Sequence, residues 1–369
     1  MSFLEIDNLR KEFGGLTAVD GISLTVEEGE FITVVGPSGC GKSTTLLNVA
    51  GLQTPTAGTI RLRGQDLTDL PAYERDIGVV FQDYALFPHK TVGENIGFGL
   101  KMRGVDSEQR KSRVEEMLEI ISLEGYAEMY PHECSGGEQQ RVAVARALAF
   151  DPDLVLMDEP LSNLDKELRH SMRNELKRIQ RETGVTTIYV THNQTEALSM
   201  GDRLAVLNDG QVEQFGDPKN AYQNPETPFV AGFLGQSSRL DGVYSDSPGP
   251  QIETTSGVTF DVTPQEQVGD GDDVALFLRN ELVGFATGDA DPTNTFEGVV
   301  DEVDYQGRDV VYLVEVPELD SVVEVSGKRK HGGTDVLEKG ASVSISIAPE
   351  DVIYTPLEGQ VRTAEAASV

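Results

Sequence analysis

The segment Gly36-Pro37-Ser38-Gly39-Cys40-Gly41-Lys42-Ser43 matches the pattern G-x-x-x-x-G-K-[ST] at every position. The apolar run FITVV at 31–35 precedes it, and a helical pattern over 43–51 follows it. Glycines in such a strand–loop–helix unit let backbone amides curl around a phosphate, which also faces the positive end of the helix. We expect Lys42 to reach the β- and γ-phosphates and the Ser43 hydroxyl to ligate Mg²⁺. The segment therefore predicts a nucleotide-binding site, but it does not define the reaction.

Around this segment, up to about residue 235, strand-like apolar runs alternate with helical patterns. That alternation is typical of a mostly parallel sheet wrapped by helices. Shorter β segments are expected in the first 30 residues or so and over 58–80. The longer strands are expected at 31–35, 154–157, 186–190 and 203–207, and the helices near 43–51, 107–122, 138–149, 165–183 and 194–200.

After residue 235 the helical period is absent. Short alternating stretches such as VALFL and DVVYLVEV follow, separated by Gly, Pro, Asp and Asn. This pattern predicts a small all-β barrel or sandwich. With 369 residues, the chain is too long for one typical core. We therefore predict two domains, 1–235 and 236–369.

The net charge of the chain limits the kinds of partner that it is expected to bind. It carries 62 acidic and 30 basic residues, a net charge of −32, so phosphate backbones should repel it and nucleic acid is an unexpected partner. This charge favours a protein from a cytoplasm of high salt, where screening is strong; an ordinary acidic cytosolic protein is the alternative. There are only two cysteines, and no apolar run of 18 or more residues. The pattern predicts a cytosolic, water-soluble chain that acts on membranes only through a partner.

Two further strand ends carry chemistry-bearing residues. The run LVLMDEP closes with Asp158 and Glu159, which should lie beside the phosphate loop at the carboxyl edge of the sheet. Asp158 suits Mg²⁺, and Glu159 suits a general base acting on water, which favours an ATPase over a kinase. His192 follows the run TTIYVT and is a candidate γ-phosphate contact, while Gln82, after GVVF, can touch Mg²⁺ or water.

The segment CSGGEQQ at 134–140 has the S-x-x-E spacing of a helix capping box, with Ser135 as N-cap and Glu138 at the third helical position. Gly136 and Gly137 weaken that first turn, because glycine is a poor helix former. A side chain at either position would block a phosphate from the backbone. The segment therefore combines a cap with a candidate phosphate site.

Taken together, GPSGCGKST, VVFQ, CSGGEQQ, LVLMDEP, SNLD and VTHNQ resemble, in this order, the nucleotide-binding subunit of ATP-binding-cassette (ABC) transporters. The resemblance covers residues 3–235 or so. The stretch VFQDYALFPHKTVGENIGFGLKMRG and the β-rich C-terminal part are similar to importer ATPases that serve polyamines, sugars, ferric iron or sulfate. It implies a P-loop NTPase cassette with a helical subdomain at about 84–150, followed by an OB-like regulatory and dimerisation domain.

The same resemblance implies a role for each motif residue. The cassette would bind ATP and Mg²⁺, with Phe13 stacking on adenine and Gln82 linking nucleotide to the membrane subunit. Ser135, Gly136 and Gly137 would meet ATP held by a second copy, Asp165 would be the acid of the D-loop (SNLD, 162–165), and His192 would be the switch histidine. The predicted nucleotide contacts are Phe13, Gly36, Pro37, Ser38, Gly39, Cys40, Gly41, Lys42, Ser43, Thr44, Ser135, Gly136, Gly137, Glu138 and Asp165; the predicted Mg²⁺ ligands are Ser43, Gln82 and Asp158.

The chain departs from the family at three motif positions. Asn163 replaces the more usual alanine, Cys134 the usual leucine, and Glu138 a frequent glutamine. All three leave the Ser-Gly-Gly core intact, so we expect an active site. A head-to-tail dimer would bring Cys134 toward Cys40 of the other copy, which predicts a disulfide between copies under mild oxidation.

Two alternatives stay open from the sequence. The apolar residues between Tyr84 and Met102 either form the core of a helical subdomain or line a groove for a helix of a membrane subunit, and both can hold. The function implied is that of the energy-coupling ATPase of an uptake transporter, dimeric on two ATPs, bound to permeases at the cytoplasmic face of the membrane and served by a solute-binding protein. Polyamines are the favoured solute. The alternative is a soluble cassette ATPase not coupled to transport.

Overall fold

Residue contacts divide the chain into two compact units, Met1–Lys219 and Asn220–Val369. The structure is a computed structural model and describes residues 2–286, 293–306, 309–328 and 336–357. The division falls inside α8 (Pro218–Gln223), earlier than the predicted boundary at 235/236. The reason is that α9 (Pro228–Phe233) packs on β14 (Asp273–Arg279) and β20 (Ile353–Pro356) of the second unit. The limits 1–235 and 236–369 remain predictions for the family domains.

A six-stranded sheet forms the centre of the first unit, in the order β10-β9-β3-β8-β7-β6. Every neighbouring pair is parallel except β9 and β10. The mostly parallel sheet expected from the alternating pattern is thus confirmed. Its strands are β3 (Phe31–Val35), β6 (Ile77–Val80), β7 (Leu154–Asp158), β8 (Thr186–Thr191), β9 (Arg203–Asn208) and β10 (Gln211–Gly216).

Both faces of this sheet are buried. Successive side chains of a strand point to opposite faces, and the two hydrophobic cores divide the strands accordingly. Phe31, Val155 and Tyr189 belong to one core, while Ile32 and Leu156 belong to the other. This explains why the strands read as continuous apolar runs rather than as alternating ones.

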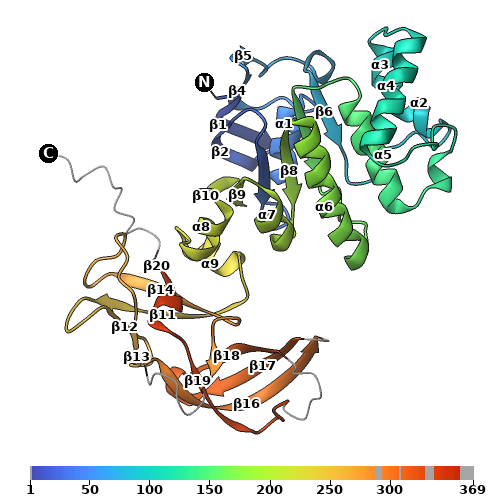
Figure 1. Ribbon diagram of the computed structural model, residues 1–369. Helices are drawn as coiled ribbons and strands as arrows, with labels where there is room; N and C mark the ends of the chain where they lie inside the picture. The colour runs from blue at the N-terminus through green and yellow to red at the C-terminus, as the bar shows by residue number, and fades with distance from the viewer. Residues whose placement is uncertain (1, 287–292, 307–308, 329–335, 358–369) are drawn as a thin grey trace. The chain divides into compact units, whose positions relative to one another are not determined.

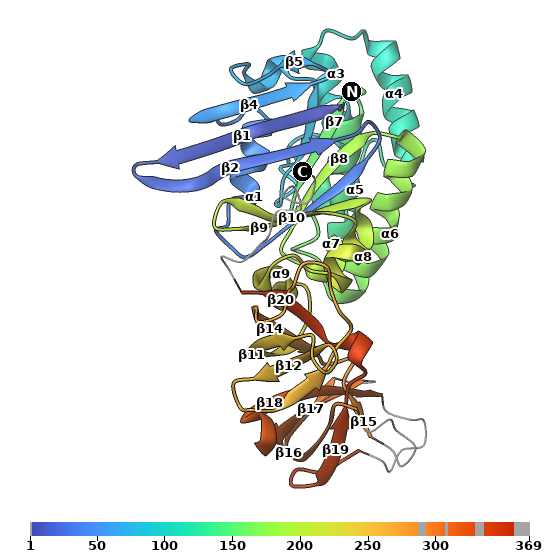
Figure 2. The ribbon, with the colours of Figure 1, turned by 90° about the vertical axis from the view of Figure 1, so that its left-hand side faces the viewer.

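A separate antiparallel sheet, in the order β2-β1-β4-β5, covers one face together with α1. Figure 2 shows β1, β2 and β4 side by side at one end of the first unit. The elements of this layer are β1 (Leu4–Phe13), β2 (Leu16–Val26), β4 (Ala57–Leu62), β5 (Gln65–Asp66) and α1 (Lys42–Val49).

Helices α2 to α5 gather away from β1 and β2 and form the expected helical subdomain (Figure 1). Tyr84, 8% exposed, packs in the same core as Val92 and Ile96, and the Phe87 ring lies 4.6 Å from that of Phe98. The apolar residues after Gln82 therefore supply the core of this subdomain. The α-helices between α1 and β9 are α2 (Val92–Ile96), α3 (Phe98–Met102), α4 (Ser107–Ile120), α5 (Gly136–Leu148), α6 (Lys166–Thr183) and α7 (Gln194–Met200).

The second unit is built on two five-stranded sheets, in the orders β13-β12-β11-β14-β20 and β15-β19-β16-β17-β18. All their pairings are antiparallel, and one shared hydrophobic core contains residues of both sheets. The expected all-β domain is confirmed. Its other strands are β11 (Ser237–Ser245), β12 (Gln251–Thr254), β13 (Thr259–Asp261), β15 (Gly284–Phe285), β16 (Thr295–Gln306), β17 (Asp309–Val316), β18 (Ser321–Lys328) and β19 (Ser342–Ser346).

Candidate functional site

The glycine-rich loop runs from the carboxyl end of β3 to the first residue of α1, as the motif predicts. Two of its glycines are required by packing: a Cβ on Gly36 would lie 2.2 Å from the Leu207 carbonyl oxygen, and one on Gly41 2.4 Å from that of Ala18. Gly39 has a φ of +86° and nothing within 4 Å of where its Cβ would be. The loop is thus fixed at both ends and open to a ligand in its middle.

Lys42 is the cation of this loop, and it is only 5% exposed. Its Nζ donates to the carbonyl oxygens of Gly36 and Pro37, at 2.8 Å each. In the described part of the chain, Lys42 makes no hydrogen bond to a carboxylate. A buried ammonium held only by neutral carbonyls can exchange them for phosphate oxygens, which form stronger, charge-assisted bonds.

Asp158 ends β7 beside the first turn of α1. The Ser43 hydroxyl donates to its Oδ1 at 2.9 Å. Burial raises the pKa of Asp158, the Ser43 hydrogen bond acts in the opposite direction, and the neighbouring Glu159 raises it further. A buried carboxylate whose ionised form is disfavoured gains from a nearby cation. Oxygen donors of this kind are those that Mg²⁺ prefers.

Glu159 follows Asp158 with a φ of +45°, in the left-handed region. That conformation costs about 1–2 kcal/mol for a residue with a side chain. The Glu159 N–H donates to the Val190 carbonyl at 3.0 Å, and its Oε2 lies 2.8 Å from Nδ1 of His192. The strained turn therefore brings the predicted base and the predicted switch histidine into direct contact, across two neighbouring strands.

Gln82 lies just beyond β6, with an exposed side chain. Its carbonyl oxygen accepts from Nδ2 of Asn163 at 3.1 Å. The same Nδ2 lies 3.4 Å from Oδ1 of Asp83. Asn163 is one of the three departures from the family, and it links the Gln82 loop to the D-loop.

Asp165 caps α6, because its Oδ1 accepts from the Leu168 N–H at 2.9 Å. This role within the chain is one that the motif does not reveal. The contact of Asp165 across a dimer stays a prediction.

The capping box at the start of α5 is confirmed. Oε2 of Glu138 accepts from the Ser135 N–H at 2.7 Å and from the Ser135 hydroxyl at 2.8 Å, and Ser135 caps the Glu138 N–H. These bonds lower the pKa of Glu138, and the Tyr126 hydroxyl donates to its other oxygen. A Cβ on Gly136 would make only an ordinary contact, 3.4 Å from Leu164. Packing within the chain does not require that glycine.

The predicted adenine contact and the two cysteines have very different exposures. The Phe13 ring is 44% exposed, and Nζ of Lys11 lies 5.0 Å from its centroid. Cys40 and Cys134 are 3% and 7% exposed, and burial raises the pKa of both thiols. Because the thiolate is the reactive species, burial of both thiols within one chain disfavours a cross-link between them. The disulfide expected between copies stays a prediction, because it depends on a second copy.

Sequence reasoning missed the polar side chains that support His192. Glu196 is 3% exposed and accepts from the hydroxyls of Tyr189 and Thr191, at 2.8 Å each. Arg169 approaches the same carboxylate. The motif VTHNQ stops before Glu196, and nothing in the helical pattern marks that acid as buried.

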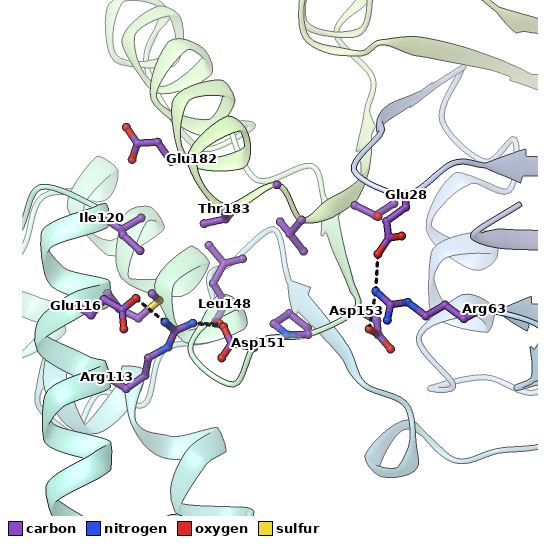
Figure 3. Close-up of a pocket in the computed structure, with 15 residues that line it drawn as sticks. Glu28, Arg63, Arg113, Glu116, Ile120, Leu148, Asp151, Asp153, Glu182 and Thr183 are labelled. Carbon is purple, nitrogen blue, oxygen red and sulfur yellow. Dashed lines mark hydrogen bonds and ion pairs between the residues drawn. The ribbon is translucent and has the colours of Figure 1, made fainter.

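A cleft of about 430 Å³ lies elsewhere on the first unit (Figure 3). It is lined by Asp153 and Thr186, which stand at the amino ends of β7 and β8, so it opens at the opposite edge of the sheet from Asp158. Figure 3 shows its two arginines, Arg63 and Arg113, bound to acidic neighbours. The cleft contains none of the predicted site residues.

The described residues contain no helix long and apolar enough to cross a membrane. They also contain no group of three or more His, Cys, Asp or Glu side chains that could hold a metal ion.

Residues 19–162 match the family model of the ABC transporter, and residues 273–354 match that of the TOBE domain. A spermidine/putrescine import ATP-binding protein of Thermobifida fusca is 43% identical over 344 residues, which are 92% of this chain and 89% of the relative. A xylose/arabinose import ATP-binding protein of Haloferax volcanii is 41% identical over 366 residues, 96% of this chain and 93% of the relative.

Among solved structures, a dimeric ATP-binding cassette in a post-hydrolysis state bound to ADP and Pi is similar to this chain. It is 36% identical, with a TM-score of 0.52, and the match covers 58% of this chain and 98% of that one. With the phosphate loop, the paired carboxylates and the histidine at one sheet edge, these similarities agree on one assignment. The chain belongs to the ABC transporter family, as an ATP-hydrolysing import subunit with a C-terminal TOBE domain.

Proposed function

We propose that the chain hydrolyses Mg²⁺-ATP to drive import of a polyamine, such as spermidine or putrescine, through membrane permease subunits. The observation that carries the chemistry is the meeting of Lys42, Ser43, Asp158, Glu159 and His192 at the carboxyl edge of one sheet. The solute rests on similarity to polyamine import proteins.

In this proposal the backbone amides of residues 36–44 and the Lys42 ammonium bind the ATP phosphates. Ser43, Asp158 and Gln82 would hold Mg²⁺, which neutralises phosphate charge when bound. The residues fit that ion, because a hydroxyl and a buried carboxylate 2.9 Å apart offer oxygen donors beside the loop. Phe13, exposed near the end of β1, would stack on adenine.

Glu159 would accept a proton from the attacking water. Its carboxylate is 20% exposed and lies against His192, so it is held yet reachable by solvent. His192, whose side chain is 55% exposed, would bond the γ-phosphate while orienting Glu159.

A second copy would complete the site, head to tail. Ser135, Gly136 and Gly137 would face the γ-phosphate of the other copy, with Glu138 and Asp165 shaping that surface. Support comes from the open surroundings of Gly136, where packing leaves room for a side chain and yet there is none. The similar cassette structure is dimeric.

The exposed Gln82 loop would contact the permease subunits at the cytoplasmic face of the membrane, with a solute-binding protein acting on their far side. The alternative function, a soluble cassette ATPase, predicts no membrane partner. Affinity purification of the chain from detergent-solubilised membranes separates the two: permeases are expected, and recovery only in a soluble complex contradicts transport.

The solute can be tested by uptake. Cells lacking this gene should lose uptake of radiolabelled putrescine or spermidine, and the wild-type gene should restore it while a Glu159→Gln variant should not. Normal polyamine uptake with lost xylose or arabinose uptake would favour the sugar, the runner-up suggested by the second relative.

The net charge of −32 supports a high-salt setting for the chain. Melting temperature and ATPase rate should both rise as KCl approaches molar concentrations. A protein that is fully stable and active in dilute buffer would contradict this part of the proposal.

A further inference from the structure

The loop that carries His192 is held on both sides by hydrogen bonds that lead to one buried carboxylate, that of Glu196. Oε2 of Glu196 accepts from the Thr191 hydroxyl, just before His192, and Thr191 Oγ1 in turn accepts from the Asn193 N–H at 3.0 Å, just after it. Tyr189 of β8 donates to the same oxygen at 2.8 Å. Thr191 and Tyr189 are 2% and 0% exposed, so water does not compete for these bonds. The position of the His192 loop therefore depends on where the Glu196 carboxylate lies.

The D-loop is held in a similar way by hydrogen bonds from one guanidinium, that of Arg169. Arg169, in the first turns of α6, donates from Nη2 to the Leu164 carbonyl at 2.8 Å and from Nε to the Leu161 carbonyl at 3.3 Å. The Ser162 carbonyl lies 3.5 Å from Nη2. One planar side chain thus ties three carbonyls of this turn, a geometry that an ammonium group cannot reproduce.

The Arg169 guanidinium and the Glu196 carboxylate lie next to each other. Nε of Arg169 lies 3.9 Å from Oε1 of Glu196, the carboxylate oxygen not used by Tyr189 and Thr191. Helices α6 and α7, which carry the pair, pack together beside β8 (Figure 1). Glu159, Ser162 and His192 line the same small crevice as Arg169 and Glu196. The Arg169–Glu196 pair therefore lies beside both the predicted hydrolysis site and the D-loop.

We propose that Arg169 and Glu196 are a positioning pair that couples the His192 loop to the D-loop, and so transmits the state of the γ-phosphate to the second copy. The inference rests on the proposed dimeric ATPase. At 3.9 Å the pair is an ion pair but longer than a hydrogen bond. The distance between Arg169 and Glu196 can therefore shorten or lengthen as His192 gains or loses a phosphate partner. The D-loop carbonyls that are bound to Arg169 then move with it. Neither residue touches the reacting atoms.

Steady-state ATP hydrolysis by the full-length chain tests the pair. Arg169→Ala and Glu196→Gln should each lower kcat about tenfold and bring the Hill coefficient for ATP toward 1, with KM changed less than about twofold. Arg169→Lys should rescue only part of kcat, because it keeps the charge but not the bridging geometry. The double variant should lose no more than either single one, because the residues act as one unit. Arg181→Ala, an exposed arginine on the same helix, is the matched control and should resemble wild type.

Thr191→Val provides a near-isosteric variant that keeps both charges, in case Arg169→Ala or Glu196→Gln does not fold. It should lower the Hill coefficient while leaving the melting temperature within a few degrees of wild type. Additive losses in the double variant, unchanged cooperativity, or a fall in kcat that only follows a fall in melting temperature would overturn the coupling role. A non-cooperative wild type would also overturn it. A wild-type chain that does not hydrolyse ATP would instead contradict the proposed function.

Discussion

The two edges of the central sheet carry similar residues in opposite arrangements. At the amino edge, each of the five carboxylates that line the cleft of Figure 3 pairs with an arginine. At the carboxyl edge, Lys42 is bound by carbonyls, Asp158 by a hydroxyl and Glu159 by an imidazole. At the amino edge, three arginines give every one of these carboxylates a cationic partner. At the carboxyl edge, neither Lys42 nor Asp158 is hydrogen-bonded to a group of opposite charge among the described residues. The difference teaches that a cleft alone does not identify a site, whereas charged side chains held only by neutral groups at strand ends do.

The largest expected effect concerns Glu159 at the carboxyl edge. Glu159→Gln should lower turnover by about 10²–10⁴-fold with ATP binding retained, because the amide cannot accept the proton of the attacking water. The measurement is phosphate release at saturating ATP. Asp153→Asn at the amino edge is the control and should change turnover less than about twofold; equal losses in both variants would remove the contrast between the edges.

Asp158→Asn should lower Mg²⁺-dependent hydrolysis by about a hundredfold. It should also raise the melting temperature at neutral pH. The pKa of Asp158 is raised in the fold, so the folded chain takes up a proton at a higher pH than the unfolded chain does. The wild type therefore gains stability as pH falls through that raised pKa, toward the ordinary Asp value, and loses it as pH rises.

The check is a pair of melting curves for wild type and Asp158→Asn across pH, without nucleotide. Their difference in melting temperature should shrink on acidification. A constant difference would show that burial does not disfavour this carboxylate.

At the amino edge, Arg113→Ala should affect stability and leave catalysis alone. Arg113 donates to the Ala149 carbonyl at 3.0 Å and pairs with Asp151 and Glu116, so it ties α4 to the end of α5. Loss of these partly buried bonds should cost about 2 kcal/mol, which lowers the melting temperature by roughly 4–8 °C. Calorimetry measures the loss. A raised KM for ATP would mean that this edge takes part in nucleotide binding.

The smallest effect is expected for Asn163→Ala. Its Nδ2 donates to the Gln82 carbonyl across an exposed contact, so removal should change kcat by only about twofold. Permease-stimulated ATPase activity should fall more than basal activity, because the Gln82 loop is the proposed link to the permease. Equal changes in both activities would argue against that link.

Most of the fold and the principal site residues could be predicted from sequence. Strands buried on both faces read as apolar runs, and parallel strands present their carboxyl ends together, so the motifs at Lys42, Asp158 and His192 had to meet. The capping box of Ser135 and Glu138 was also predictable, because it depends only on two residues three positions apart in the sequence.

Contacts between distant segments were not predictable. The Asn163–Gln82 bond and the approach of Arg169 to Glu196 depend on how loops and helices pack, which no local pattern encodes. The low exposures of Cys40 and Cys134 likewise arise from tertiary packing, and they disfavour the disulfide expected between copies. The division of the chain inside α8 reflects the packing of α9 on β14 and β20, which its sequence does not reveal.

The most direct test of the central claim is an equilibrium titration of Mg²⁺-ATP against wild type, Lys42→Ala and Arg63→Ala. Each variant removes one cation, from the carboxyl edge and the amino edge respectively. We predict that Lys42→Ala weakens ATP binding at least about tenfold while Arg63→Ala leaves it unchanged. Normal affinity in Lys42→Ala, or a loss in Arg63→Ala, would contradict the assignment of the site to the carboxyl edge.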